Sequence, residues 1–520
     1  MQAAHVETVD ALIALLRVNP NSKQNWHALF QCCYLLDDLQ TAVSHALALM
    51  PRLVSPEDVL LPFGQFLVRQ GFHDAAVMLF EAIVREEPDA RHAHSDLIVH
   101  TQLYGCDDDA VREYRLWNER FVAPLARLSN AAKTSQELGR PLRIGFVSND
   151  FAGNHSLNAV MVPWFMYKER RLNRYIFYSN CRHNTPFHRV FLEAADVFVD
   201  VDDLTDEQFA VRIRQDQIDI LVDFISHGTP NRLLTYARKP APIIVSWGAL
   251  GIPTGAETVD YIITDKIAVP PASVGLYREK IAYLPHVSMA WCPPRSAPKV
   301  EMAPPNLHKD IVFGNLTRIV KFQKETIDLW ASVLRRVPNA KMLLKDQRLT
   351  GQIAKRIASM FRQCGIGDDR LILREGTDHA HHLEAYNDVN IVLDCYPQTG
   401  GISTLEALWM GVPVVTYCHP IKPSGRWGRH MLENIGLSSL VLDTKEAYVA
   451  TAAFLAERAD QRNVLRRNLR QRVAGSPLCD VEDFQRGVAA AFDQMWRRYC
   501  SNQLPDSFAI EKSYDPKMDR

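Results

Sequence analysis

The sequence predicts an α/β protein with two doubly wound, Rossmann-like domains preceded by an all-α repeat domain. The first 125 residues carry a repeating helical pattern, and from Leu142 onward short apolar strands alternate with helical segments. A Pro-rich stretch between Pro293 and Pro305 divides these strands into two blocks. Because parallel strands need long crossover connections, this alternation predicts two parallel sheets.

Composition excludes several classes of protein. The 520 residues are 47% hydrophobic and 23% charged, which is ordinary for a globular chain of several domains. Lys and Arg total 59 against 60 Asp and Glu, so no overall field attracts nucleic acid or an anionic membrane. The first residues lack the features of a secretory signal, and Pro and Gly interrupt the longest uncharged stretch, 240–256. We therefore expect a cytoplasmic protein that binds neither nucleic acid nor membranes.

Metal-ligand patterns are sparse. The ten cysteines show no C-x-x-C spacing, which favours reduced core thiols over a disulfide framework or a zinc site. The His-rich segment 378–382 is the only cluster that invites a metal, and no second group of regularly spaced ligands accompanies it. We expect no metal.

The N-terminal repeat has a period of 34 residues. Equivalent positions in its helices hold Leu29, Phe63 and Leu97, then Ala42, Ala76 and Ala110, while Asp37, Gly71 and Gly105 fall at the turns. This pattern predicts tetratricopeptide-like repeats over 1–125. Such an array either offers a concave peptide-binding groove or serves as a structural cap on the next domain, and the sequence leaves both open.

The remaining boundaries follow from the strand blocks. We predict a linker over 126–140, an N-terminal Rossmann-like lobe over 141–292, a linker over 293–305 and a C-terminal Rossmann-like lobe over 306–480. A helix over 481–500 and a polar, flexible tail over 501–520 complete the chain.

A glycine loop between Leu393 and Pro413 is the most informative segment. A buried strand runs into Gly400 and Gly401, and an apolar helix follows, so the free N–H groups of that helix offer a seat for a diphosphate. Glu406, one turn into the helix, is suited to accept hydrogen bonds from a ribose diol. Ser403 to Glu406 also fits a capping box, in which Glu406 would be purely structural.

Several further blocks occur in a fixed order. They are Ser148 to His155, His227-Gly228-Thr229, Arg238 to Pro242, Trp247 to Gly251, Asp260 to Asp265, Tyr283 to His286, Phe313-Gly314-Asn315 with Lys321, and Leu393 to Pro413. Together they resemble the O-linked N-acetylglucosamine transferase family, which also includes plant protein O-fucosyltransferases and bacterial protein N-glucosyltransferases. The resemblance covers about 142–500 and implies a GT-B fold, in which the two lobes face a cleft. It marks the N-terminal lobe as the acceptor side and the C-terminal lobe as the nucleotide-sugar side.

The resemblance implies an inverting, metal-independent transfer of N-acetylglucosamine or glucose from a UDP-sugar to Ser or Thr of a protein. Lys321 is similar to the family lysine that contacts the diphosphate, where a cation stabilises the departing oxygen. His155 and His227 are the acceptor-side candidates, because a neutral imidazole suits a base or an orienting group. This chain has one extra residue before His155, and Gly228 separates His227 from Thr229.

On the nucleotide side, the resemblance implies roles for Asn315, His382, Gly400, Gly401, Ser403, Thr404 and Glu406. Glu406 stands where many members have Asp, and Gly401-Ile402 replaces the His-Thr of animal enzymes. UDP is favoured over GDP. No cofactor is implied beyond the UDP-sugar itself, which serves as co-substrate.

Three alternatives stay open. The closest rival transfers glucose to Asn, and no residue discriminates an amide from a hydroxyl acceptor. A repeat-based protein that binds nucleotide without turnover is the second, because of the departures near His155 and Gly401. A sugar-nucleotide epimerase shares the architecture but needs no repeat array.

Overall fold

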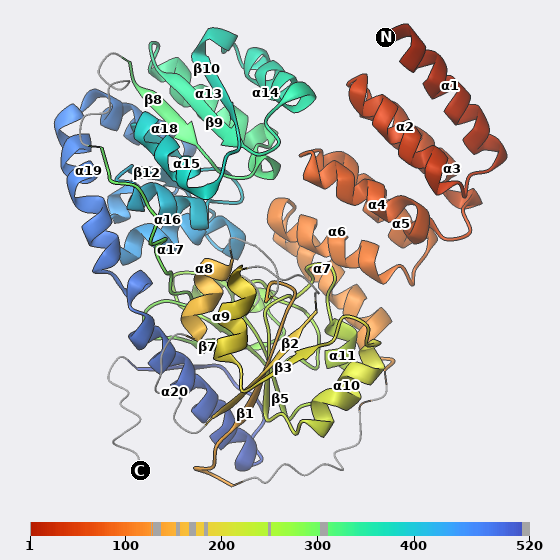
Figure 1. The fold of residues 1–520 in the computed structure, drawn as a ribbon, viewed down its shortest axis with the longest axis vertical. Helices are drawn as coiled ribbons and strands as arrows, with labels where there is room; N and C mark the ends of the chain where they lie inside the picture. Colours follow the sequence, from red (N-terminus) through yellow and green to blue (C-terminus); the bar gives the residue numbers. More distant parts are fainter. Residues whose placement is uncertain are drawn as a thin grey trace.

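The computed structural model describes residues 2–125, 127, 137–151, 157–165, 173–180, 186–247, 251–301 and 310–511. It has three parts: a helical array at the N-terminus, a lobe built on one parallel sheet, and a second lobe built on another (Figure 1). The predicted fold class is confirmed. None of the helices in the described part of the chain is long and apolar enough to span a bilayer.

The repeat array consists of paired antiparallel helices. They are α1 (Gln2–Val18), α2 (Lys23–Leu35), α3 (Leu39–Leu49), α4 (Pro56–Arg69), α5 (His73–Glu86), α6 (Arg91–Tyr104) and α7 (Asp107–Trp117), followed by the π-helical turn η2 (Asn118–Val122). Side-chain caps start several of them, for example Ser55, whose Oγ accepts from Asp58 N ahead of α4. The aligned helical positions are buried in all three repeats, whereas the turn residues Asp37 and Gly105 are exposed. The core of the array runs through Leu97, and Ala110 packs in a core shared with the N-terminal lobe.

The N-terminal lobe contains an eight-stranded sheet in the order β14-β7-β6-β5-β4-β1-β2-β3, and every pair is parallel. Its strands are β1 (Arg143–Ser148), β2 (Arg174–Ser179), β3 (Val197–Asp200), β4 (Ile220–Asp223), β5 (Ile243–Ser246), β6 (Tyr261–Thr264) and β7 (Lys280–Tyr283). Helices α8 (Asn158–Met161), α9 (Pro186–Ala194), α10 (Asp206–Gln215) and α11 (Leu233–Ala237) connect some of them. The central strands β1, β4, β5 and β6 are almost entirely buried, as a sheet covered on both faces requires.

The C-terminal lobe contains a six-stranded parallel sheet in the order β10-β9-β8-β11-β12-β13. Its strands are β8 (Val312–Asn315), β9 (Lys341–Asp346), β10 (Leu371–Glu375), β11 (Ile391–Leu393), β12 (Val414–Tyr417) and β13 (Val441–Leu442). Its helices are α13 (Lys324–Arg336), α14 (Gly351–Gln363), α15 (His379–Glu384), α16 (Ile402–Trp409), α17 (Trp427–Asn434), α18 (Lys445–Glu457) and α19 (Ala459–Ala474).

The end of the chain returns to the N-terminal lobe. Helix α20 (Val481–Cys500) descends from the C-terminal lobe (Figure 1), and its Phe484 ring packs 5.4 Å from that of Trp164. Strand β14 (Phe508–Ala509) then pairs with β7. The expected flexible tail over 501–520 is therefore wrong for this part, because backbone pairing fixes it to the sheet; residues 512–520 lie outside the described residues.

Candidate functional site

Strand order locates the candidate site of the C-terminal lobe. The order reverses between β8 and β11, and in open parallel sheets ligands bind at the carboxyl ends of the strands at such a point. The loop after β8 carries Lys321, and the loop after β11 carries Gly400. Sequence and topology thus place the two predicted diphosphate elements at one edge.

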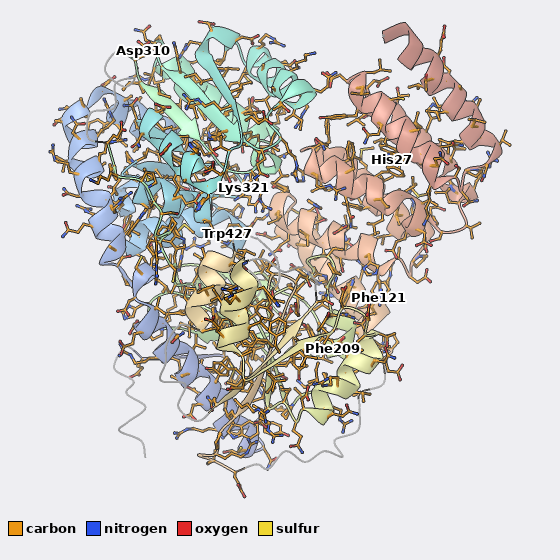
Figure 2. All side chains as sticks on the ribbon, in the orientation of Figure 1. His27, Phe121, Phe209, Asp310, Lys321 and Trp427 are labelled. Atoms are coloured by element: carbon orange, nitrogen blue, oxygen red, sulfur yellow. The ribbon has the colours of Figure 1, made fainter. Side chains whose placement is uncertain are left out.

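Lys321 lies against the glycine loop. Its Nζ donates to the Thr399 carbonyl oxygen at 2.6 Å, directly before Gly400, and lies 5.3 Å from the ring centroid of Trp427 (Figure 2). The side chain is only 5% exposed, and burial lowers its pKa to about 8. Lys321 is therefore a desolvated cation near neutral pH, which strengthens its attraction for a bound anion.

The Asp394 carboxylate holds the glycine loop through hydrogen bonds. One carboxylate oxygen accepts from Gly400 N at 2.6 Å and from Cys395 N at 2.8 Å, and the other accepts from Thr416 Oγ1 at 2.8 Å. A Cβ on Gly400 would lie 2.2 Å from Thr404 Oγ1, so this position has no room for a side chain. The sequence singled out the glycine but missed Asp394, whose place directly after a buried strand was the available signal.

Glu406 faces two histidines of α15. Its Oε1 lies 2.7 Å from His379 Nε2, and its Oε2 lies 3.7 Å from His382 Nε2. Burial alone would raise the pKa of Glu406, but these partners outweigh it and hold that pKa below its usual range. Within the described residues no side chain caps the start of α16, so the capping-box alternative is wrong.

The other predicted nucleotide-side residues lie around the same edge. Asn315 ends β8, is 3% exposed, and donates from Nδ2 to the Leu393 carbonyl oxygen at 2.8 Å, so it ties β8 to β11. Gly401 caps α16, and Ser403 and Thr404 lie in its first turn. The Ser403 carbonyl oxygen accepts from Tyr386 Oη at 2.9 Å, which fixes that turn to the loop following α15. The residues predicted for the nucleotide side thus lie together at this edge of the sheet.

In the N-terminal lobe, the strand order reverses between β1 and β4. His155 follows β1 but lies outside the described residues. His227 follows β4 and is 2% exposed, and its Nε2 lies 2.8 Å from the Thr254 carbonyl oxygen while Nδ1 lies 3.2 Å from Ser95 Oγ of the repeats. Burial lowers the pKa of His227 to about 3. His227 therefore lies in the interface between the repeats and the N-terminal lobe. This position gives no support to the predicted role of His227 as an acceptor-side base.

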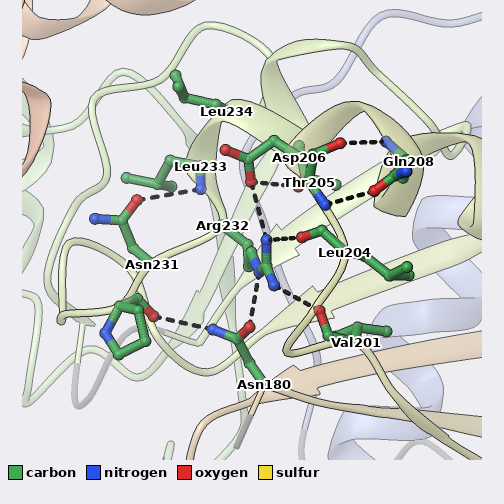
Figure 3. Close-up of polar contacts among 12 residues, drawn as sticks. Asn180, Val201, Leu204, Thr205, Asp206, Gln208, Asn231, Arg232, Leu233 and Leu234 are labelled. Carbon is green, nitrogen blue, oxygen red and sulfur yellow. Dashed lines mark hydrogen bonds and ion pairs between the residues drawn. The ribbon is translucent and has the colours of Figure 1, made fainter.

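Arg232 holds several loops of the N-terminal lobe in place (Figure 3). Its Nε donates to Asn180 Oδ1 at 2.8 Å, and its two terminal nitrogens donate to the carbonyl oxygens of Leu204 and Val201 at 2.7 and 2.6 Å. Asn180 in turn donates to Asn149 Oδ1 at 2.8 Å, at the end of β1. A buried guanidinium therefore joins the segments that follow β2 and β3, and Asn180 links them to the end of β1.

The repeats dock on both lobes. Arg356 of α14 donates to the Gln70 carbonyl oxygen at 2.8 Å, and Gln352 donates to that of Leu35 at 2.6 Å. On the other lobe, Thr229 Oγ1 donates to Asp96 Oδ1 at 3.2 Å. In this structure the array serves as a cap packed on the two lobes, one of the two predicted alternatives.

Contacts also cross between the lobes themselves. His430 Nε2 of α17 lies 2.8 Å from Asp265 Oδ2, and Ser273 Oγ donates to the Ile421 carbonyl oxygen at 2.6 Å. Burial alone would raise the pKa of Asp265, but His430 and the hydrogen bonds from Ser288 and Ala268 lower that pKa to about 2. The described residues contain no group of three or more His, Cys, Asp or Glu side chains placed to hold a metal ion.

Two Rossmann-like lobes, the second with a lysine and a glycine loop at its switch point, form the architecture of a GT-B protein. The model of glycosyl transferase family 41 matches residues 123–290 and 304–488. The chain therefore belongs to glycosyl transferase family 41.

Named relatives agree with this assignment. The chain is 30% identical over 437 residues to the rice (Oryza sativa subsp. japonica) probable UDP-N-acetylglucosamine–peptide N-acetylglucosaminyltransferase SPINDLY, covering 82% of this chain and 47% of that protein. It is 27% identical over 382 residues to the Arabidopsis thaliana protein SEC, which bears the same enzyme description, covering 71% of this chain and 38% of that one. The chain thus spans about half the length of such relatives, or less.

A solved structure matches over nearly the whole chain. It is a mutant of the O-GlcNAc transferase of Thermobaculum terrenum, with a TM-score of 0.84 and 28% identity. The match covers 96% of this chain and 99% of that one, so it includes the helical array as well as both lobes.

Proposed function

We propose that this protein transfers N-acetylglucosamine or glucose from a UDP-sugar to Ser or Thr of a protein, by an inverting and metal-independent reaction. The observation that carries the proposal is the contact of Lys321 Nζ with the Thr399 carbonyl oxygen at 2.6 Å, beside the Gly400 bend. A buried cation and exposed N–H groups at a helix start are what a leaving diphosphate needs. The relatives named for peptide N-acetylglucosaminyl transfer support the donor and acceptor classes.

Each part of the site has a role in this proposal. Lys321 and the first turn of α16 neutralise the charge that develops on the diphosphate. Glu406, kept ionised by His379 and His382, accepts hydrogen bonds from the ribose, and His382 borders the base. Asn315 holds β8 against β11, so that Lys321 and Gly400 keep their spacing. His155 stays our acceptor-side candidate, and His227 acts by fixing the repeats to the lobe.

Donor choice is tested first by thermal unfolding with a panel of UDP- and GDP-sugars. A donor that binds only the folded protein raises its free energy of unfolding by mass action, by about 2.7 kcal/mol at a hundredfold excess over Kd, and the melting temperature rises with it. We expect the largest shift with UDP-N-acetylglucosamine or UDP-glucose, and a smaller one for the Lys321→Ala variant. A shift confined to GDP-sugars would contradict the nucleotide assignment.

Transfer is tested with the preferred donor and a library of peptides, read by intact-mass and fragment analysis. We expect a gain of one sugar on Ser or Thr, with unchanged yield after chelation and an anomeric configuration opposite to that of the donor. Label on Asn alone would establish the rival N-glucosyl transfer. Donor binding with no product from either wild type or Lys321→Ala would favour a binding protein, and release of a rearranged donor would indicate an epimerase.

A further inference from the structure

Two side chains of the repeat domain reach the loops of the donor site. Tyr104, the last residue of α6, donates from Oη to Gln398 Oε1 at 2.7 Å and lies 3.2 Å from the Val320 carbonyl oxygen. His73, the first residue of α5, places Nε2 2.8 Å from the same carbonyl oxygen. The repeats therefore contact both donor loops, through the buried His73 and the half-buried Tyr104.

The residues contacted by the repeats, Val320 and Gln398, are sequence neighbours of Lys321 and of its acceptor Thr399. Val320 directly precedes Lys321, and Gln398 directly precedes Thr399, whose carbonyl oxygen accepts from Lys321 Nζ at 2.6 Å. The Tyr104 hydroxyl thus lies between the Val320 carbonyl oxygen, next to Lys321, and the Gln398 side chain, next to Thr399. Both neighbours are acceptors, so the single hydroxyl proton goes to Gln398 Oε1, the nearer of the two, and His73 donates to the Val320 carbonyl oxygen.

The hydrogen-bond partners of His73 and His100, which pack against Tyr104, determine which ring nitrogens carry protons. A carbonyl oxygen only accepts, so Nε2 of His73 carries a proton, and its Nδ1 accepts from Nδ1 of His100 at 3.2 Å. Burial lowers the pKa of His73 to about 4 and that of His100 to about 3, so both rings are neutral at physiological pH. The Tyr104 ring lies 4.3 Å from that of His73 between centroids. This packed cluster leaves Tyr104 Oη little freedom to move.

We propose that the repeat domain supplies positioning residues to the donor site: Tyr104, backed by His73 and His100, holds the Lys321 loop against the glycine loop. This inference rests on the proposed function. It gives the last repeat a part in the reaction without direct contact with donor or acceptor.

Loss of the hydroxyl has two consequences. Gln398 Oε1 loses its donor, and the Lys321 loop loosens, so the ammonium spends less time where the diphosphate leaves. A looser loop also admits water to Lys321, whose electrostatic neighbours are Asp394, Cys395 and Arg318. Because burial is what lowers the pKa of Lys321, added water moves that pKa upward.

The test compares Tyr104→Phe with Tyr114→Phe. Tyr114 is a buried tyrosine of the neighbouring helix α7 whose hydroxyl has no hydrogen-bond partner in the described part of the chain, so the same substitution there removes no hydrogen bond. We expect Tyr104→Phe to lower kcat about tenfold and to move the alkaline limb of the kcat/KM profile to higher pH. Tyr114→Phe should match wild type in both.

A structural role alone would lower the melting temperature of Tyr104→Phe and leave kcat and the pH limb unchanged, and that result overturns the inference. His73 offers a second route if Tyr104→Phe does not fold. His73→Gln retains an N–H donor for Val320, whereas His73→Leu does not, so the inference requires that only the leucine variant lose activity. Equal activity of these two overturns it as well. Absence of transfer by wild type with every donor would instead refute the proposed function.

Discussion

The pH dependence of donor use should report the state of Lys321. Burial lowers the pKa of this lysine to about 8, against 10.5 for the unperturbed group. The cation is the form that binds diphosphate, so kcat/KM should be level below that pKa and fall above it. About nine tenths of the molecules carry the charge at about pH 7, half at about pH 8 and one eleventh at about pH 9. The expected decrease between the first and last of these is therefore about tenfold.

The assay is peptide modification at donor concentrations well below KM, over about pH 6.5 to 9.5, because kcat/KM then reports groups of the free enzyme. Unfolding temperatures over the same range check that the protein stays folded. Lys321→Ala should be about 10² to 10³ times slower and should lack the alkaline limb, because the titrating group is gone. The reasoning is refuted if wild type shows no inflection near pH 8, or if the alanine variant keeps the same limb.

Three further predictions concern the surroundings of the site. Gly400→Ala should lower the free energy of unfolding by about 1 to 3 kcal/mol in chemical denaturation, because its Cβ would lie 2.2 Å from Thr404 Oγ1; Gly401→Ala, whose nearest neighbour is Trp427 at 3.8 Å, should be nearly neutral. Acidification from pH 7 to about pH 5 should cost about 2 kcal/mol for each of His73, His100 and His227, because each pKa is lowered on folding and the unfolded state binds the proton; their asparagine variants should lose less stability over the same range in thermal unfolding. Arg356→Ala should speed hydrogen exchange at the end of α4, because it removes the donor to Gln70 and the contact 4.3 Å over Phe72, whereas replacement of the exposed Lys355 should not.

The sequence predicts ten of the strands because each is a short apolar run bounded by turn residues or by a helical pattern; the runs are 142–148, 174–180, 218–224, 242–248, 260–265, 310–316, 340–346, 370–375, 390–394 and 413–417. It missed β3, β7, β13 and β14. Strands β13 and β14 have only two residues each, and β3 and β7 are partly exposed, unlike the fully buried four-residue strands that were predicted. The turn positions of the repeats were predicted better. Asp37 and Gly71 both adopt positive φ, at 59° and 81°, as the end of a helix before a tight turn requires.

The proximity of Lys321 to Gly400 could be predicted because each follows a strand at the topological switch point. Contacts between domains could not. His73 and Val320 are 247 residues apart, and no local pattern in either segment indicates that they meet. The same reason explains why His227 was taken for an acceptor-side group: its position after β4 was read correctly, but its partner Ser95 lies in the repeats.

The docking of the repeats constrains how the cleft can move. The turns of the array are fixed to the C-terminal lobe at Leu35, at Gln70 and at Gly105, whose carbonyl oxygen accepts from Lys422. The helix ends there carry partial negative charge, so Arg356 and Lys422 are favourable partners. Contacts through Ser95 and Asp96 fix the same array to the N-terminal lobe. A rotation of one lobe about the linker must therefore break one of these two sets or bend the array between them, and bending would move the Tyr104 hydroxyl relative to Gln398. For this reason a change in the angle between the lobes also changes the repeat array and the position of Lys321.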